Sequence, residues 1–372
     1  MANFDKVKKT IDEKTFDPFI PDYINLSSYK KNGGYEIANK IKNGVISKKQ
    51  VLDSLNESGL KGKGGAGFPT GKKWEIVSNY NGKKYVAVNG DEGEPGTFKD
   101  RSYLESDPHR FLEGALIASY FINAQKVYIY MRDEYPTVIK ILLDEINKME
   151  DEEIIPKDFF IVRRGAGAYI CGEESAMIES IEGKRGLPRH RPPYVAEIGL
   201  FGCPTLTNNL ETLFWVRDII EKGAKWFAEK GSNGNKGFHS FSVSGRVKNP
   251  GVKVAPAGIT IQQLIDEYCD GMADGHTFKG YLPGGASGGI LPAAMNDIPL
   301  DYGSKELMDA GCFLGSAAVV VLSDHDNMKD VALNLLKFFE EESCGQCTPC
   351  RSGTEKTVKL MQENNWNKEK LK

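Results

Sequence analysis

The sequence has no long hydrophobic run. Its N-terminal segment, MANFDKVKKTIDEKTFDPFI, lacks an apolar core of signal-peptide length, and no later run approaches the roughly 20 apolar residues that a membrane-spanning helix needs. We therefore expect a cytoplasmic chain without direct membrane insertion, either free or peripheral to a membrane complex.

The sequence also has no excess of charge of one sign. It contains 48 Lys and Arg residues against 51 Asp and Glu residues, which leaves a formal net charge of -3. A chain without a strong net field does not recruit polyanions by charge alone. We therefore predict no nucleic-acid partner.

Cysteine is sparse and odd in number, with seven residues in the chain, three of them in one short segment. This pattern disfavours a disulfide framework and indicates a metal site in a reducing compartment. Glycine, by contrast, is abundant at 40 residues. Such a concentration indicates loops that approach ligands closely.

The first part of the chain alternates strand and helix patterns. KKYVAVNG reads as a strand ending at Val88, AQKVYIYM as a second strand, and TVIKILLDEINKME as a helix. KDFFIVRRG predicts a third strand, which is followed by a helix that starts near Gly172. This alternation predicts an α/β fold with a parallel sheet, whose ligands bind beyond the carboxyl ends of the strands.

The pattern changes twice further along the chain. FHSFSVSGRVKNPGVKVAP predicts short strands with a turn at 249–251, and the loop LPGGASGGILP follows within a small α+β domain. From Asp326 the sequence is helical, with an apolar stripe that we expect to pack on helices outside this chain. We predict three domains, at residues 1–235, 236–323 and 324–372.

The segment GLKGKGGAGFPTGKKW is a glycine-rich loop. It is not a P-loop, because that motif would need glycine in place of Ala66 and a hydroxyl in place of Lys73. Glycines let backbone lie against a planar or phosphorylated ligand, Lys73 can supply charge to a phosphate, and Phe68 can stack on a ring. A flexible surface loop is the alternative, although the Phe68-Pro69 pair argues against it.

Polar groups crowd the end of the first strand, in VNGDEGEPGTFKDR. Asn89, Asp91, Glu92 and Glu94 lie within six positions and would repel one another unless they bind something. Ribityl or ribose hydroxyls and ring-nitrogen donors are suitable partners, and magnesium is the competing one. A solvated acidic turn is the third possibility.

Two further polar segments adjoin predicted helices. In GAGAYICGEES, Glu173 and Glu174 stand at the first turn of a helix, where carboxylates are natural caps. Near a nucleotide they would also accept ribose hydroxyls and repel a 2′-phosphate, which favours NAD over NADP. In TLTNNLET, Asn208 and Asn209 are expected to be N-caps.

The segment ESCGQCTPCRSG holds Cys344, Cys347 and Cys350 at C-x-x-C-x-x-C spacing. Metal sites of this kind usually have four ligands, and no Cys or His follows Cys350. A zinc knuckle, an iron–sulfur cluster and redox thiols all remain open on this segment alone.

Taken in order, these segments resemble the NADH-binding flavoprotein subunit of respiratory complex I and its relatives, the diaphorase subunits of NAD-dependent and electron-bifurcating hydrogenases and formate dehydrogenases. The resemblance runs from about residue 50 to about residue 355. It implies a Rossmann-like FMN domain, a ubiquitin-like β-grasp domain of the soluble-ligand-binding (SLBB) type, and a helical bundle that carries a [4Fe–4S] cluster.

The resemblance also implies site residues at matching positions of this sequence. Those implied for FMN are Gly62, Gly64, Lys73, Asn89, Asp91, Glu92, Gly172, Glu173, Asn208, Asn209 and Thr212. Those implied for NAD are Gly65, Gly67, Phe68, Glu94, Glu174, Arg191 and Tyr194, with Phe68 and Tyr194 stacking on its rings. Those implied for the cluster are Cys344, Cys347 and Cys350.

The implied activity is hydride transfer from NADH to FMN, followed by one-electron transfer to the cluster, with no side chain as acid or base. The implied partners are a thioredoxin-like [2Fe–2S] subunit and a larger iron–sulfur subunit. A diaphorase role beside a hydrogenase or formate dehydrogenase is the alternative within the family. A non-catalytic scaffold is the alternative outside it, but the acidic and aromatic site residues are all in place.

The sequence departs from the family pattern at two points. Lys63 stands where arginine is usual, a larger change if the contact is bidentate. The fourth cluster cysteine would fall beyond Lys372, and the remaining cysteines, Cys171, Cys203, Cys269 and Cys312, are unconvincing substitutes. We therefore expect a chain cut short of its natural C-terminus, with an incomplete or labile cluster.

Overall fold

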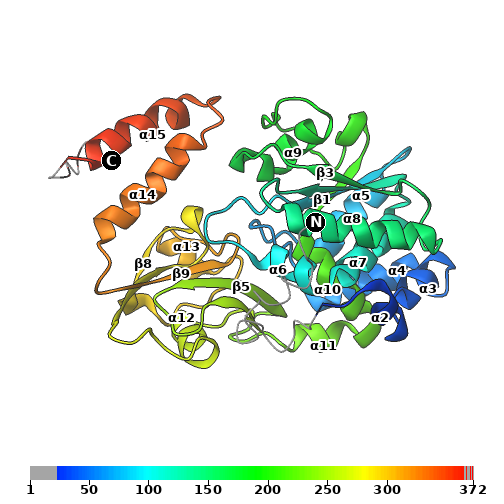
Figure 1. The fold of residues 1–372 in the computed structure, drawn as a ribbon, viewed down its shortest axis with the longest axis horizontal. Coiled ribbons are helices and arrows are strands. Elements are labelled where there is room, and N and C mark those ends of the chain that lie inside the picture. The colour runs from blue at the N-terminus through cyan, green and yellow to red at the C-terminus, as the bar shows by residue number, and fades with distance from the viewer. Residues whose placement is uncertain (1–22, 364–365, 367–368, 370, 372) are drawn as a thin grey trace.

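The computed structural model describes residues 23–363, 366, 369 and 371. Two β-sheets organise two halves of the molecule, and a pair of helices follows the second sheet (Figure 1). The first 22 residues of the predicted first domain lie outside the described residues, as do six positions of the predicted third domain: 364, 365, 367, 368, 370 and 372. No helix in the described part is long and apolar enough to cross a bilayer.

The first sheet has the strand order β3-β2-β1-β4, and all of its pairings are parallel. Its strands are β1 (Tyr85–Gly90), β2 (Lys126–Met131), β3 (Phe160–Arg164) and β4 (Thr205–Asn209). The runs YVAV and VYIYM are almost wholly apolar, as strands buried on both faces require. The predicted parallel sheet is confirmed, and β1 extends two residues beyond the predicted end at Val88.

Helices surround the first sheet. They are α2 (Leu26–Lys31), α3 (Glu36–Lys42), α4 (Lys48–Ser58), α5 (Thr70–Ser78), α6 (Lys99–Ser106), α7 (Pro108–Ile122), α8 (Pro136–Asp151), α9 (Glu174–Ile181), α10 (Leu210–Lys222) and α11 (Ala224–Ala228), with the short turns η2 (Tyr169–Gly172) and η3 (Leu200–Gly202). The central pair is α7 and α10, which meet at Gly114: a Cβ there would lie 1.9 Å from the Leu213 carbonyl oxygen. Close backbone approach therefore requires glycine at this crossing.

The second sheet is mixed, in the order β6-β5-β9-β7-β8. Its strands are β5 (Phe238–Gly245), β6 (Gly251–Pro256), β7 (Phe278–Leu282), β8 (Leu291–Pro292) and β9 (Ala318–Ser323), joined by α12 (Ile261–Gln263), η4 (Leu264–Tyr268), η5 (Ala286–Gly288), η6 (Ala293–Met295) and α13 (Lys305–Asp309). β5 runs parallel to β9 and antiparallel to β6. A separate apolar cluster forms its core, which includes Phe241, Tyr281 and Val319.

Two helices follow the second sheet, α14 (Met328–Glu341) and α15 (Thr348–Met361). Figure 1 shows the pair projecting away from the sheets. No residue of α14 is fully buried, and its main ring contact with the first half places Phe338 5.1 Å from Tyr169. The second helix begins at Thr348, inside the cysteine segment, because Pro349 suits a first helical turn. Cys350 is therefore helical.

Candidate functional site

Two adjoining cavities lie at the carboxyl ends of β1 and β4, with volumes of about 390 Å³ and 640 Å³. We call them the smaller and the larger cavity. Both are lined by Gly64, Asn89, Gly172, Glu173 and Asn209. Because they share these walls, they form one continuous site of a size typical for cofactors and substrates.

The glycine-rich loop connects α4 to α5 and forms one wall of the site. Its ends are tied together, because the Gly62 N–H donates to the Phe68 carbonyl at 2.8 Å. Gly67 has a φ of +62°, and a Cβ there would lie 2.5 Å from the Tyr302 Cβ. The loop is thus packed against the second half, which does not support the flexible-loop alternative.

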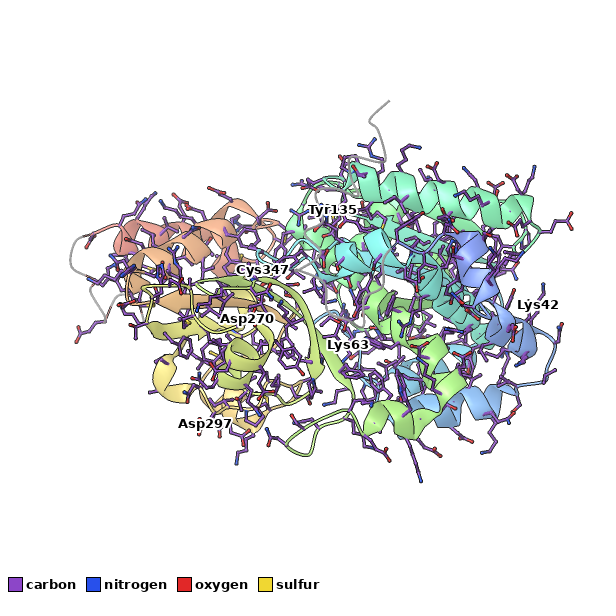
Figure 2. All side chains as sticks on the ribbon, turned by 60° about the horizontal axis from the view of Figure 1, so that its bottom comes forward. Lys42, Lys63, Tyr135, Asp270, Asp297 and Cys347 are labelled. Atoms are coloured by element: carbon purple, nitrogen blue, oxygen red, sulfur yellow. The ribbon has the colours of Figure 1, made fainter. Side chains whose placement is uncertain are left out.

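The Lys63 side chain is held at the contact with the second half, although the residue also lines the smaller cavity. It is only 2% exposed, and its ammonium donates to the Phe238 carbonyl and, at 2.9 Å, to His239 Nδ1. Figure 2 shows Lys63 at the junction of the two halves. Burial lowers the pKa of Lys63 to about 8. Its backbone N–H donates to the Thr212 hydroxyl at 2.8 Å, so Thr212 supports the loop from behind.

The carboxylates of Asp91, Glu92 and Glu94, which follow β1, point in different directions. Asp91 is buried behind the loop turns: a Cβ on Gly172 would lie 3.3 Å from its Oδ2, and burial raises the pKa of Asp91 to about 7. Glu92 accepts the backbone N–H groups of Asp100 at 2.7 Å and Arg101 at 3.1 Å, at the start of α6. Burial raises the pKa of Glu92 above its ordinary range.

Glu94 points the other way, toward the smaller cavity. One carboxylate oxygen accepts the N–H and the hydroxyl of Ser287, both at 2.7 Å, and the other accepts the Tyr169 hydroxyl. Within residues 23–363, 366, 369 and 371, no three His, Cys, Asp or Glu side chains converge to hold a metal ion. The magnesium alternative therefore gains no support from this acidic loop.

A charged network lines the larger cavity. Glu174 accepts the Thr207 hydroxyl at 2.7 Å and lies 3.4 Å from the Lys73 ammonium and 3.3 Å from Arg191. Burial alone would raise the pKa of Glu174, but Lys73, Thr207 and Arg191 together hold it below its ordinary value. Glu174 is therefore an ionised carboxylate on the cavity wall.

The predicted caps are only partly correct. Glu173 caps α9, because its carboxylate accepts the N–H groups of Ser175 at 3.0 Å and Ala176 at 3.1 Å. Asn209 caps α10 through the Glu211 N–H at 3.1 Å. Asn208 is not a cap: it lies within β4, and its side-chain oxygen accepts the Trp74 indole N–H at 3.0 Å. Asn209, the last residue of β4, directly precedes α10, whereas Asn208 lies one position earlier and its side chain is held by Trp74.

Large apolar side chains remain exposed around the larger cavity. Phe68 is 41% exposed, Tyr194 58% and Ile76 37%, and all three line it. Rings and branched side chains left open to water on one cavity provide a stacking surface for a planar ligand. Phe68 and Tyr194 were predicted for this purpose, whereas Ile76, on α5, was not.

The residues predicted for each ligand are distributed over both cavities. The FMN set divides into five residues on both cavities (Gly64, Asn89, Gly172, Glu173, Asn209), Glu92 on the smaller, Gly62, Lys73 and Asn208 on the larger, and Asp91 and Thr212 on neither. The NAD set divides into Gly65 and Glu94 on the smaller cavity, and Gly67, Phe68, Glu174, Arg191 and Tyr194 on the larger.

The second half contributes to the site, which the sequence patterns did not predict. Ser287, Phe313, Gly315 and Ser316 all line the smaller cavity, beside Tyr169 and Lys99 of the first half. Lys99 is buried and its ammonium contacts Asp100 and Glu211, each at 2.9 Å. The glycine cluster LPGGASGG was the one available signal, since such loops approach ligands closely.

The cysteines of the α14–α15 segment are free and accessible. Cys347 and Cys350 are exposed and Cys344 is half-buried. The guanidinium of Arg351 folds back on this segment and donates to the Gly345 carbonyl at 2.7 Å. By contrast, burial raises the pKa of Cys171, Cys269 and Cys312, which lie in the cores of the two halves.

Comparison with known families agrees with this arrangement. A family described as the Nuo51 FMN-binding domain matches residues 55–218, which include the glycine-rich loop and both cavities' first-half walls. A second, described as the NADH-ubiquinone oxidoreductase-F iron-sulfur binding region, matches residues 330–371, which include the three cysteines. The chain thus contains an FMN-binding domain and a 4Fe-4S binding region.

Individual relatives cover most of the chain. It is 43% identical over 351 residues to the second F subunit of NADH-quinone oxidoreductase in Rhizobium meliloti, covering 92% of this chain and 83% of that protein. It is 41% identical over 351 residues to the corresponding protein of Aquifex aeolicus, covering 92% and 80%. The fold is similar to the crystal structure of an air-oxidised NAD+-reducing [NiFe]-hydrogenase, with a TM-score of 0.79 and 32% identity. That match covers 96% of this chain and 62% of the hydrogenase chain, less than two thirds of its length.

Identity at this level over nearly the whole chain is decisive when the flavin and iron–sulfur regions match as well. The chain belongs to the family of the NADH-quinone oxidoreductase F subunit, the 51 kDa flavoprotein of complex I.

Proposed function

We propose that this chain oxidises NADH by hydride transfer to FMN and passes the electrons to a [4Fe–4S] cluster in the α14–α15 segment. The observation that carries the proposal is the pair of joined cavities inside the matched FMN-binding domain. Two cofactor-sized spaces with common walls suit two rings that must meet face to face. When bound, FMN supplies the chemistry that accepts a hydride and releases electrons singly.

The site residues fit a flavin nucleotide. The glycines at 62–67 and at Gly172 leave space in the site that side chains would otherwise fill. At Gly64, for example, a Cβ would lie only 3.1 Å from the Asn209 Cβ. Asn89, Asn209 and Glu92 supply polar atoms around this space, and Lys73 supplies a cation. We assign the full FMN set given above to this role, with Asp91 and Thr212 acting from behind the walls.

The larger cavity suits a dinucleotide. Phe68 and Tyr194 would stack on its rings, and Glu174 would accept ribose hydroxyls with Arg191 beside it. An ionised Glu174 disfavours a 2′-phosphate, so we infer NADH rather than NADPH as the substrate. The dinucleotide would extend to Glu94 in the smaller cavity.

We further infer the finer architecture and assembly that the family implies. The first-sheet half would be a Rossmann-like FMN domain and the second-sheet half a β-grasp SLBB domain, with boundaries at residues 235 and 323. A thioredoxin-like [2Fe–2S] subunit and a larger iron–sulfur subunit would receive the electrons in the cytoplasm, at the edge of a membrane complex.

A second candidate function is the diaphorase role beside a hydrogenase. The fold similarity to an NAD+-reducing [NiFe]-hydrogenase favours it, with a TM-score of 0.79. The same site would then serve the reverse hydride transfer, to NAD+. Co-purification of the chain with its natural partners, followed by their identification, separates the two functions.

FMN uptake tests the proposed function. Purified chain incubated with FMN should retain it through gel filtration, and Glu92→Lys should abolish retention, because a cation there would face the Lys99 ammonium. Glu229→Lys, at the end of α11 and on neither cavity wall, is the matched control. Equal retention by the wild type and Glu92→Lys would contradict the assignment. Absence of FMN uptake by the wild type would favour the scaffold alternative.

A further inference from the structure

The carboxylate of Glu94 bridges the two halves of the molecule. Its Oε1 accepts both the N–H and the hydroxyl of Ser287, each at 2.7 Å, across 193 positions of sequence. Its Oε2 accepts a hydrogen bond from the hydroxyl of Tyr169. Burial and the nearby Glu94 raise the pKa of Tyr169, so this hydroxyl stays a donor. Ser287 and Tyr169, which belong to opposite halves, therefore both donate hydrogen bonds to the same carboxylate.

These hydrogen bonds leave the Glu94 carboxylate with little remaining acceptor capacity. An ionised carboxylate has roughly four acceptor positions on its two oxygens. Three are used by the Ser287 N–H, the Ser287 hydroxyl and the Tyr169 hydroxyl. One position, on Oε2, remains on the wall of the smaller cavity, which suits a ligand that offers a single N–H donor.

The loop that carries Ser287 is held rigidly. The Gly285 N–H donates to the Ala318 carbonyl of β9 at 2.7 Å, and Phe313 donates to the Gly288 carbonyl at 3.2 Å. Gly285 has a φ of +81°, and a Cβ there would lie 2.6 Å from the Glu94 Cγ. The second sheet therefore fixes the position of Ser287, and through it the direction of Glu94.

We propose that Ser287 is a positioning residue that aims Glu94 at the carboxamide N–H of the nicotinamide ring. The second half thereby sets the affinity for the reacting end of the dinucleotide. This inference rests on the proposed function, because it places NADH in the joined cavities. Ser287 itself need not touch the dinucleotide.

The test compares two ligands that differ at that end. Binding of NAD+ and of ADP-ribose, which lacks nicotinamide, is measured by calorimetry on the FMN-loaded protein and its Ser287→Ala variant. We expect the variant to bind NAD+ about 3- to 10-fold more weakly, because one hydrogen bond to a charged group is lost. ADP-ribose binding should change less than about twofold, because the carboxamide is absent.

Three variants complete the design. Ser287→Thr keeps the hydroxyl and should bind NAD+ within about twofold of the wild type. Ser232→Ala makes the same truncation at a hydroxyl that donates to the Ala257 carbonyl of the second half, on neither cavity wall, and should change neither affinity. In a Glu94→Ala background, which removes the acceptor oxygens, Ser287→Ala should have no further effect on NAD+, because its action passes through the carboxylate.

Four outcomes would overturn the inference. An equal loss of NAD+ and ADP-ribose affinity would make Ser287 a structural residue only. An undiminished Ser287→Ala effect in the Glu94→Ala background would exclude action through Glu94. A wild-type protein that holds FMN and binds both ligands, with Ser287→Ala unchanged, would refute this inference alone. A wild-type protein that binds neither ligand would overturn the proposed function with it.

Discussion

The Lys63 ammonium donates to His239 Nδ1 at 2.9 Å, which joins the glycine-rich loop to the first strand of the second sheet. His239 Nε2 lies 2.6 Å from Asp301, which also holds Lys61 at 2.8 Å. An acceptor at Nδ1 and a donor at Nε2 describe a neutral imidazole. The loop is thus fixed at Lys61 and Lys63 by one chain of polar contacts.

This contact predicts a loss of stability in mild acid. Burial, then Lys63, lowers the pKa of His239 to about 4, whereas the unfolded chain has the ordinary value of about 6.5. The unfolded state therefore binds more protons between these values, so stability is present above pH 6.5 and falls as the pH drops toward 4. Urea unfolding at pH 7 and pH 5 should differ by about 1–3 kcal/mol from this group. In His239→Gln that contribution should vanish; an unchanged difference would assign the acid sensitivity to other groups.

Removal of the buried cation should loosen the loop. Lys63→Met would leave the Phe238 carbonyl and His239 Nδ1 without their donor, at a cost of about 2–3 kcal/mol in the free energy of unfolding. FMN should also be bound more weakly, because the next residue, Gly64, lines both cavities. Lys225→Met, at an exposed position on α11, is the control and should change neither property. Lys63→Met with wild-type stability and flavin affinity would show that the contact is incidental.

Glu174 should govern the choice between NADH and NADPH. Glu174→Gln removes the ionised carboxylate that Lys73 and Arg191 maintain. We expect the ratio of kcat/KM for NADH to that for NADPH to fall about 10-fold, since a charge near the 2′-position no longer repels phosphate. Glu179→Gln, on the same helix but on neither cavity wall, provides the comparison. A ratio unaffected by Glu174→Gln would place the ribose elsewhere.

The exposed cysteines should hold the iron. Cys347→Ser should lower bound iron and sulfide at least severalfold while leaving FMN reduction by NADH intact, because the cysteine segment lines neither cavity. Cys203→Ser is the matched control. Iron and sulfide are measured per chain after anaerobic reconstitution. Zinc in place of iron, or equal iron in Cys347→Ser, would contradict the assignment.

Local patterns in the sequence predicted much of the fold. The apolar runs at β1 and β2 and the start of a helix after Asn209 are set by neighbouring residues, so periodicity and capping chemistry suffice. Asn208 failed as a predicted cap because two asparagines in a row looked alike. Only the strand register decides which of them reaches the helix.

Long-range contacts could not be predicted in this way. Lys63 meets His239 176 positions later, and Glu94 meets Ser287 193 positions later. Both pairs exist because the second sheet packs beside the first, which no local pattern encodes. The site was therefore predicted as a single-domain pocket, whereas its smaller cavity is closed by two halves of the chain.

Anaerobic titration of the FMN-loaded protein with NADH is the decisive measurement for hydride transfer within the joined cavities. We expect the visible flavin band to bleach as NADH is added and to return with ferricyanide. We also expect Glu94→Gln to require more NADH for the same bleaching. Bound FMN that stays oxidised in excess NADH would contradict hydride transfer at this site.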